Sequence, residues 1–173
     1  MSVEKLIITI FAKDRPGIIQ AMSDTVLSHQ GNWLESSLSR LCGQFTGIAH
    51  ISIDEHKKTD LVNALKELEN DGIQVTFQNS ADFDTEGDEI ESIQMLVEAN
   101  DRPGIVEEIT SVLSDVNVNV EHMDTECESA SMAGYDLFRA HLSLALPDGF
   151  GEAELEEVLE SVSDDLTVSV LEN

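Results

Sequence analysis

The sequence predicts an α+β fold in which one βαββαβ unit occurs twice. The first observation is a pentapeptide that returns unchanged after 87 residues. The second is that each copy of it follows a run of alternating apolar residues and precedes apolar residues at helical spacing. Together they indicate an internal duplication, with two tandem ferredoxin-like domains, each an antiparallel sheet carrying two helices on one face. The two pentapeptides are Asp14-Arg15-Pro16-Gly17-Ile18 and Asp101-Arg102-Pro103-Gly104-Ile105.

The elements of the first copy follow from local patterns taken in order. Alternation of apolar residues at period two predicts strands, and spacings of three and four predict helices. Pro16 suits the first turn of a helix, because proline lacks the N–H that has no partner there. Gly31 is typical of the residue that ends a helix. The predicted elements are a strand at 6–10, a helix at 16–29, strands at 32–40 and 45–53, a helix at 61–68 and a strand at 73–77.

The second copy repeats this order, ending with a helix at 155–162 and a strand at 166–170. The segment 50–53 matches 141–144 at an offset of 91, which predicts about four extra residues in the second copy. We place them in the loop 129–134. The same alignment puts His50 and His141 at matching positions on the face away from the helices. The predicted domains are residues 1–80 and 91–173, joined by an acidic linker at 81–90.

The net charge of the 173 residues is −26, and its distribution is uneven. Residues 1–80 carry a net charge of −3 and residues 81–173 one of −23. Such a surface repels phosphate backbones, so we expect no direct nucleic-acid binding. A basic protein partner and simple solubility in a salty cytoplasm both remain open as reasons for the charge.

Other classes of protein are disfavoured by the motifs that the sequence lacks. No apolar run approaches the roughly 18 residues of a membrane span, and we expect no signal peptide before the first strand. We therefore expect a cytoplasmic protein with no membrane association, in which Cys42 and Cys127 are reduced thiols. The common nucleophile, phosphate-loop and metalloprotease motifs are absent. We expect no enzyme activity, no cofactor and no metal.

The repeated loop can hold a small ligand. A helix N-terminus offers free N–H groups and the positive end of the helix dipole, which suit a carboxylate. The glycines permit close approach of a ligand or of another backbone. Asp14 and Asp101 can receive an ammonium group or cap the helix, and Arg15 and Arg102 can clamp a carboxylate.

Two asparagines are the remaining candidates. Asn32 and Asn119 open the second strand of each copy, and we expect them beside the loop, where each offers a donor and an acceptor. The same pentapeptide is also a plain turn followed by a helix start, the arginines can be solvated, and the asparagines can satisfy local backbone groups.

At these residues the sequence resembles the ACT domain family. The resemblance rests on the βαββαβ order, the Asp-Arg-Pro-Gly-Ile loop and the asparagine that opens the second strand, and it covers about residues 3–78 and 91–171. Two ACT domains without a catalytic domain look most like the glycine cleavage system transcriptional repressor group. Gly31 keeps a glycine that the family often has before the asparagine, whereas Val118 does not. We therefore expect two related pockets of unequal affinity.

The resemblance implies amino-acid pockets where ACT domains pair. Carried over, the ligand-binding residues are Asp14, Arg15, Pro16, Gly17, Ile18 and Asn32, with Asp101, Arg102, Pro103, Gly104, Ile105 and Asn119. The implied function is amino-acid sensing by a homodimer that acts through a protein partner, such as a transcriptional activator. The alternative is an interaction module that binds other proteins without any ligand.

Overall fold

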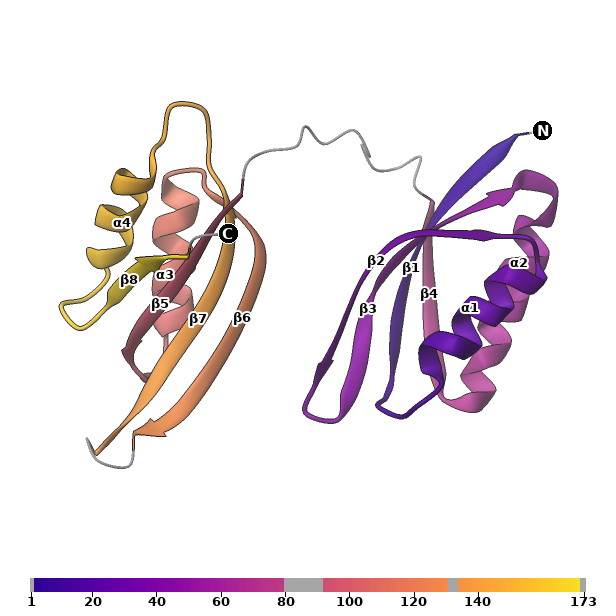
Figure 1. Ribbon diagram of the computed structural model, residues 1–173, viewed down its shortest axis with the longest axis horizontal. Coiled ribbons are helices and arrows are strands. Elements are labelled where there is room, and N and C mark those ends of the chain that lie inside the picture. Colours follow the sequence, from indigo (N-terminus) through magenta and orange to yellow (C-terminus); the bar gives the residue numbers. More distant parts are fainter. Residues whose placement is uncertain (1, 80–91, 131–133, 172–173) are drawn as a thin grey trace. The chain divides into compact units, whose positions relative to one another are not determined.

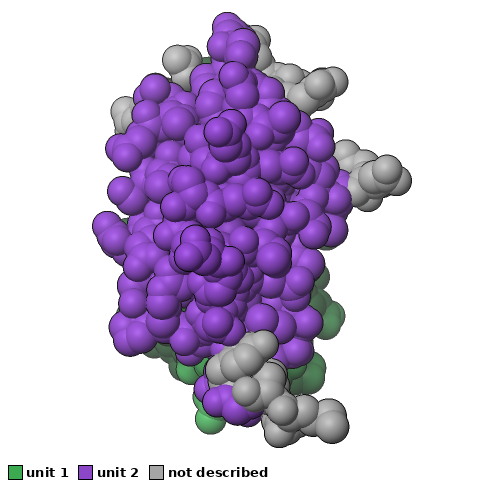
Figure 2. Space-filling model, turned by 90° about the vertical axis from the view of Figure 1, so that its left-hand side faces the viewer, with its two compact units in different colours: residues 1–87 green, residues 88–173 purple. Residues whose placement is uncertain are grey.

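The chain divides into two compact units, Met1–Gly87 and Asp88–Asn173, which are coloured separately in Figure 2. The structure is a computed structural model that describes residues 2–79, 92–130 and 134–171. Each unit has a four-stranded antiparallel sheet with its two α-helices on one face (Figure 1). The expected α+β fold, built twice, is confirmed. The predicted linker at 81–90 lies outside the described residues, so the predicted domain boundaries stay a prediction.

Unit 1 has the predicted order of elements, with strands in the spatial order β2-β3-β1-β4. Two short 3-10 helices, η1 and η2, flank its second α-helix. The elements are β1 (Val3–Lys13), α1 (Ile18–Ser28), β2 (Asn32–Leu41), β3 (Gln44–Asp54), η1 (Glu55–Lys57), α2 (Lys58–Glu67), η2 (Leu68–Asp71) and β4 (Ile73–Asn79).

Unit 2 repeats the arrangement, with strands in the order β6-β7-β5-β8. Its outer strand β6, like β2 in unit 1, pairs on one side only within its own sheet. The elements are β5 (Ser92–Asn100), α3 (Ile105–Asp115), β6 (Asn119–Ala130), β7 (Tyr135–Ala145), α4 (Glu152–Glu160) and β8 (Thr167–Val170).

The core of each unit lies between the sheet and its helices. In β1, Leu6, Ile8 and Ile10 are almost completely buried, and they alternate with residues that face away from the helices. Burying one such side chain contributes about 1.5–3 kcal/mol. From the helices, the same core receives Ile18, Met22, Val26, Leu61 and Leu65.

The pairing register shows that the second copy is longer by six residues, not four. Ile7 pairs with His50. Gln94, which lies 87 residues after Ile7, pairs with Ser143, which lies 93 residues after His50. The expected alignment of the third strands was therefore wrong by two residues. Side chains alternate between the faces of a strand with period two, so a shift of two residues keeps every apolar residue on its face.

This register also separates the two histidines that the sequence had matched. His141 pairs with Leu96 and so takes the position that Ile48 has opposite Thr9. His50 is 9% exposed, whereas His141 is exposed. The pattern shared by segments 50–53 and 141–144 is thus an apolar alternation rather than a structural equivalence.

Candidate functional site

The loop between β1 and α1 is built around a glycine that no other residue type replaces without strain. Gly17 precedes α1 as its N-cap with a φ of 93°, in the left-handed region, and Gly104 precedes α3 with the same φ. This region disfavours residues that carry a Cβ atom. At neither N-cap does a side chain form a capping hydrogen bond with the first turn of the helix. The first N–H groups of both helices are thus left without a side-chain cap, as a carboxylate seat requires.

Asp14 does not cap the helix. Its carboxylate pairs with Nε of Arg40 on β2 at 2.8 Å, and its backbone N–H donates to the carbonyl of Gly43 at 2.9 Å. Of the two roles expected for this carboxylate, capping is wrong. The side chain instead fixes the loop against the hairpin of β2 and β3.

Arg15 ties the loop to the end of η2, the 3-10 helix that follows α2. One of its terminal nitrogens, Nη2, donates to the carbonyl of Asp71 at 2.7 Å. The run from Asp14 to Gln20, together with Phe45, lines a cavity of about 290 Å³. The structure therefore gathers the five predicted loop residues of unit 1 around one cavity that includes an arginine and a helix N-terminus.

The corresponding loop in unit 2 has a different charge. Arg102 forms an ion pair with Glu108, which lies in the first turn of α3 beside Glu107. Nη1 of Arg102 is buried and has no hydrogen-bond partner among the described residues. The first turn of α1 has no acidic residue. Carboxylates are favoured at a helix N-terminus. Glu107 and Glu108 therefore already place at the N-terminus of α3 the negative charge that a ligand carboxylate would bring to the N-terminus of α1.

Two further residues beside the loops were not predicted from the sequence pattern. Arg40 pairs with Asp14, and 87 residues later Cys127 lies in its place beside Asp101. Partial loss of hydration, followed by the Asp101 and Asp136 carboxylates, raises the pKa of the Cys127 thiol. The internal repeat could have related these two residues, because position 127 lies 87 residues after position 40.

Asp165 fixes the other side of the loop in unit 2. Its carboxylate accepts from the hydroxyl of Ser163 at 2.7 Å and from the backbone N–H of Asn100 at 2.9 Å. These hydrogen bonds, with a smaller contribution from the charge of Arg102, lower the pKa of Asp165.

Each of the two asparagines lies in its own unit at the end of the sheet opposite the loop. Asn32 pairs with Ser52, which pairs with Lys5, whereas the loop follows Lys13. Eight residues of an extended strand span about 26 Å. The expectation that Asn32 lies beside its own loop is therefore wrong, because α1 carries the chain back along the sheet before β2 begins.

Asn119 shows the same separation in unit 2. It pairs with Ala145, which pairs with Ser92 at the start of β5, far from the loop that follows β5. There it lines a separate cavity of about 380 Å³ with residues from the end of α3.

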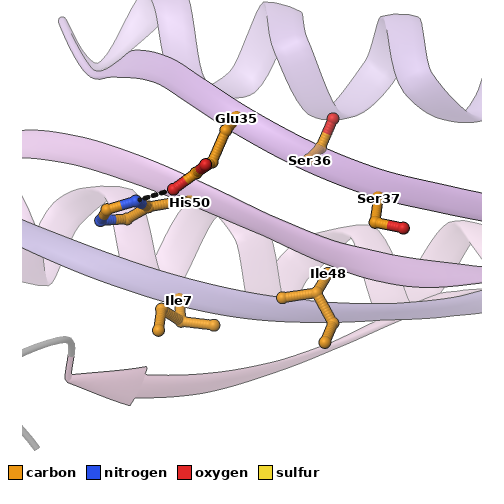
Figure 3. Close-up of a pocket in the computed structure, with 6 residues that line it drawn as sticks. All are labelled: Ile7, Glu35, Ser36, Ser37, Ile48 and His50. Carbon is orange, nitrogen blue, oxygen red and sulfur yellow. Dashed lines mark hydrogen bonds and ion pairs between the residues drawn. The ribbon is translucent and has the colours of Figure 1, made fainter. Parts of the chain in front are cut away.

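A third cavity, which the sequence did not predict, lies on the helix-free face of the unit 1 sheet. It has a volume of about 380 Å³ and is lined by Ile7, Glu35, Ser36, Ser37, Ile48 and His50 (Figure 3). Nδ1 of His50 donates to Oε1 of Glu35 at 2.9 Å, while Nε2 is buried without a partner among the described residues.

Residues 2–79, 92–130 and 134–171 contain neither a cluster of metal ligands nor a membrane-spanning helix. No three histidine, cysteine or acidic side chains gather there as metal ligands would. No helix in these segments has the length and apolar character needed to cross a membrane.

Comparison with known proteins gives matches to both units. A family model of the ACT domain matches residues 4–78, and another matches residues 93–164. A crystal structure of an unknown protein from Galdieria sulphuraria is 23% identical with a TM-score of 0.78, covering 99% of this chain and 100% of that one. A crystal structure of a "putative glycine cleavage system transcriptional repressor" is 18% identical with a TM-score of 0.72, covering all of both chains. No curated protein matches the sequence.

Proposed function

Because this chain belongs to the ACT domain family, with one ACT domain in each unit, we propose that it senses a free amino acid and regulates a partner protein. ACT domains are regulatory modules. The amino acid and the partner are the parts of the proposal that go beyond family membership. The observation that carries the proposal is the cavity beside α1, where an uncapped helix N-terminus, Arg15 and Asp14 meet.

The chemistry of this cavity fits an amino acid. The helix N-terminus and Arg15 supply positive charge for a carboxylate. The Asp14 carboxylate, 31% exposed in its ion pair with Arg40, can accept from an ammonium group. Each end of the ligand thus meets the opposite charge within one cavity.

In this proposal the loop cavity of unit 1 binds the amino acid more tightly than the corresponding loop of unit 2. In unit 2 the first turn of α3 has Glu107 and Glu108, and Arg102 is engaged by the second of these. A ligand carboxylate there would meet two negative charges. This is a physical reason for the unequal affinities expected of the two loops.

Asn32 and Asn119 join a ligand pocket only through pairing of ACT modules. Each lies at the end of its sheet away from its own loop. A neighbouring module that presents its asparagine to the loop would complete the pocket, as the domain interfaces implied by the family require. We keep both residues in the proposed site on that condition.

Glycine is the first ligand to test, and a transcriptional activator is the proposed partner. The 18% identical repressor structure shares the whole two-unit fold, and the proposal borrows its class of role from that protein. Unit 2 carries 22 acidic and 2 basic side chains, a surface suited to a basic partner protein and repulsive to DNA.

The test is calorimetric titration of the full chain with glycine and then with the other amino acids. Gln20→Glu places in unit 1 the charge that Glu107 has in unit 2. It should weaken binding by roughly two- to fivefold, the effect of one charge near a helix end. Gln30→Glu, the same change just past the end of α1, is the matched control.

The control should bind as the unchanged protein does. Absence of heat with every amino acid would refute the sensor and leave the ligand-independent interaction module. Equal binding by the Gln20→Glu variant would place the ligand elsewhere.

A further inference from the structure

The cavity beside the loop of unit 1 is lined by apolar side chains as well as by the charged groups described above. Besides Asp14 and Arg15, its lining includes Ile18, Ile19 and Phe45. Ile18 and Ile19 are the first residues of α1, and Phe45 is the second residue of β3. The charged groups suit the two ends that every free amino acid has in common. The apolar groups are the ones that can distinguish one amino-acid side chain from another.

The register of the sheet places Phe45 at the end of the sheet where the loop begins. Phe45 pairs with Ala12 on β1 and with Arg40 on β2. Ala12 lies two residues before Asp14, whose carboxylate pairs with Arg40. The side chain of Phe45 is partly buried, because it packs against the core of unit 1 while it also lines the cavity. The core thus holds the ring in place beside the proposed ligand.

Ile19 supplies the second part of this apolar wall. It is 50% exposed, although the buried side of the same helix is formed by Ile18, Met22 and Val26. A single exposed isoleucine is ordinary on a protein surface, but this one borders a cavity. An apolar ligand group that covers it is stabilised in proportion to the area removed from water. Ile19 and Phe45 together can therefore bind an apolar side chain.

The equivalent residues of unit 2 expose less apolar surface. Phe138 has the place of Phe45 in the sheet, since each pairs with the alanine that lies two residues before the loop aspartate. Phe138 is 3% exposed and belongs to the core. Val106, which lies 87 residues after Ile19, is a smaller residue and is 37% exposed. The exposed apolar wall is thus a feature of unit 1 and not of the fold.

The volume of the cavity indicates the size of the side chain that fits it. The cavity measures about 290 Å³. A water molecule takes up about 30 Å³ of the liquid, so about ten groups of that size fill the cavity. On that scale glycine, with five non-hydrogen atoms, fills about half of the cavity at most, whereas valine and leucine, with eight and nine, fill most of it. Glycine therefore leaves the wall of Ile19 and Phe45 in contact with water.

A polar side chain of the same size gains less in this cavity. In the proposed function Asp14 and Arg15 bind the ammonium and carboxylate ends of the ligand. Among the lining residues, Gln20 is the one polar side chain that is then left. A ligand hydroxyl placed against the apolar wall would lose hydration without a hydrogen bond in return. The lining thus favours an aliphatic side chain over a polar one.

We propose that the amino acid bound by unit 1 has an aliphatic side chain of the size of valine or leucine, and that Ile19 and Phe45 determine this specificity. The inference rests on the proposed amino-acid site and names the class of its ligand. Glycine binds to the same charged groups, but more weakly, because it has no side chain to cover the apolar wall.

Calorimetric titration of the full chain with two pairs of amino acids tests this specificity. Covering one carbon atom raises an affinity by about fourfold. Leucine should therefore bind at least about tenfold more tightly than glycine, even when only half of its side chain is covered. Valine should bind roughly five- to tenfold more tightly than threonine, which has the same shape but carries a hydroxyl group in place of a methyl group. The second pair separates apolar contact from size.

Two substitutions test the residues that form the wall. Ile19→Gln and Phe45→Leu should each lower the ratio of the leucine affinity to the glycine affinity by roughly two- to fivefold, because each removes apolar contact with the ligand side chain. The matched control is Leu27→Gln, a similar change at another residue of α1, which is 73% exposed and does not line the cavity. It should leave the ratio unchanged.

The possible failures of the two proposals are distinguishable. Equal affinities for valine and threonine would overturn this inference and leave the amino-acid site standing. The same conclusion would follow from an affinity ratio that neither Ile19→Gln nor Phe45→Leu reduces. Absence of heat with every amino acid would overturn this inference together with the proposed function.

Discussion

Raising the salt concentration should stabilise unit 2 far more than unit 1. Unit 1 carries 13 acidic and 7 basic side chains, a net charge of −6. Unit 2 carries 22 acidic and 2 basic side chains, a net charge of −20. Both basic residues of unit 2, Arg102 and Arg139, are already engaged in ion pairs. Mutual repulsion of the remaining acidic groups opposes the compact state of unit 2.

The size of the difference follows from Coulomb's law. The two units have nearly equal lengths, and the repulsion within a unit grows with the square of its net charge. It is therefore roughly elevenfold larger in unit 2. The screening distance falls from about 30 Å at 0.01 M salt to about 3 Å at 1 M, which removes most of this repulsion. The unfolded chain is more expanded and has less repulsion to lose.

Amide hydrogen exchange read by mass spectrometry measures both units in one sample. Protection of β5, β7 and α3 should rise strongly between 0.05 and 1 M sodium chloride. Protection of β1, β3 and α1 should change little. The fluorescence of Trp33, the only tryptophan, gives an independent measure of unit 1. Equal gains in both units would show that salt acts through hydrophobic burial, and the charge argument would be refuted.

Three further outcomes are expected. Asp101→Asn should speed alkylation of Cys127 near neutral pH, since it removes groups that raise the pKa of that thiol; an unchanged rate would contradict the assignment. Asp165→Asn should lower the melting temperature at pH 7, and the difference should vanish as the pH falls below 3.8, because a lowered pKa stabilises the fold only while the carboxylate is ionised. Gly47→Ala should destabilise unit 1 by about 1–3 kcal/mol in urea unfolding, because its Cβ would lie 2.2 Å from the carbonyl oxygen of Ser37; a neutral effect would mean that β2 shifts freely.

Most of the fold followed from local patterns in the sequence. The strands and helices came from the periods of their apolar residues, and the face assigned to His50, away from the helices, is the one observed. What local patterns could not supply was register. The two-residue error that matched His50 with His141 left every apolar residue on the correct face, so nothing in the alternation could reveal it.

Local patterns also predicted part of the candidate site, whereas the contacts between distant segments were not predictable from them. The residues of the loop are consecutive, so they surround one cavity as expected. Asn32 was misplaced because its position depends on the direction in which α1 returns along the sheet. The pairing of Asp14 with Arg40 joins distant segments and has no local signature.

The hairpin of β6 and β7 suggests how such a module tolerates growth. In unit 1 the hairpin closes at Leu41 and Gln44, whereas in unit 2 pairing continues to Ala130 and Tyr135. Each strand has therefore lengthened by two residues at this end, and because the added pairs lie beyond the existing ones, the register and faces of the rest of the hairpin are unchanged. The end of this hairpin is consequently a place where residues can be added in pairs without shifting the register of the core. A protein engineer could lengthen or graft it there without redesigning the core.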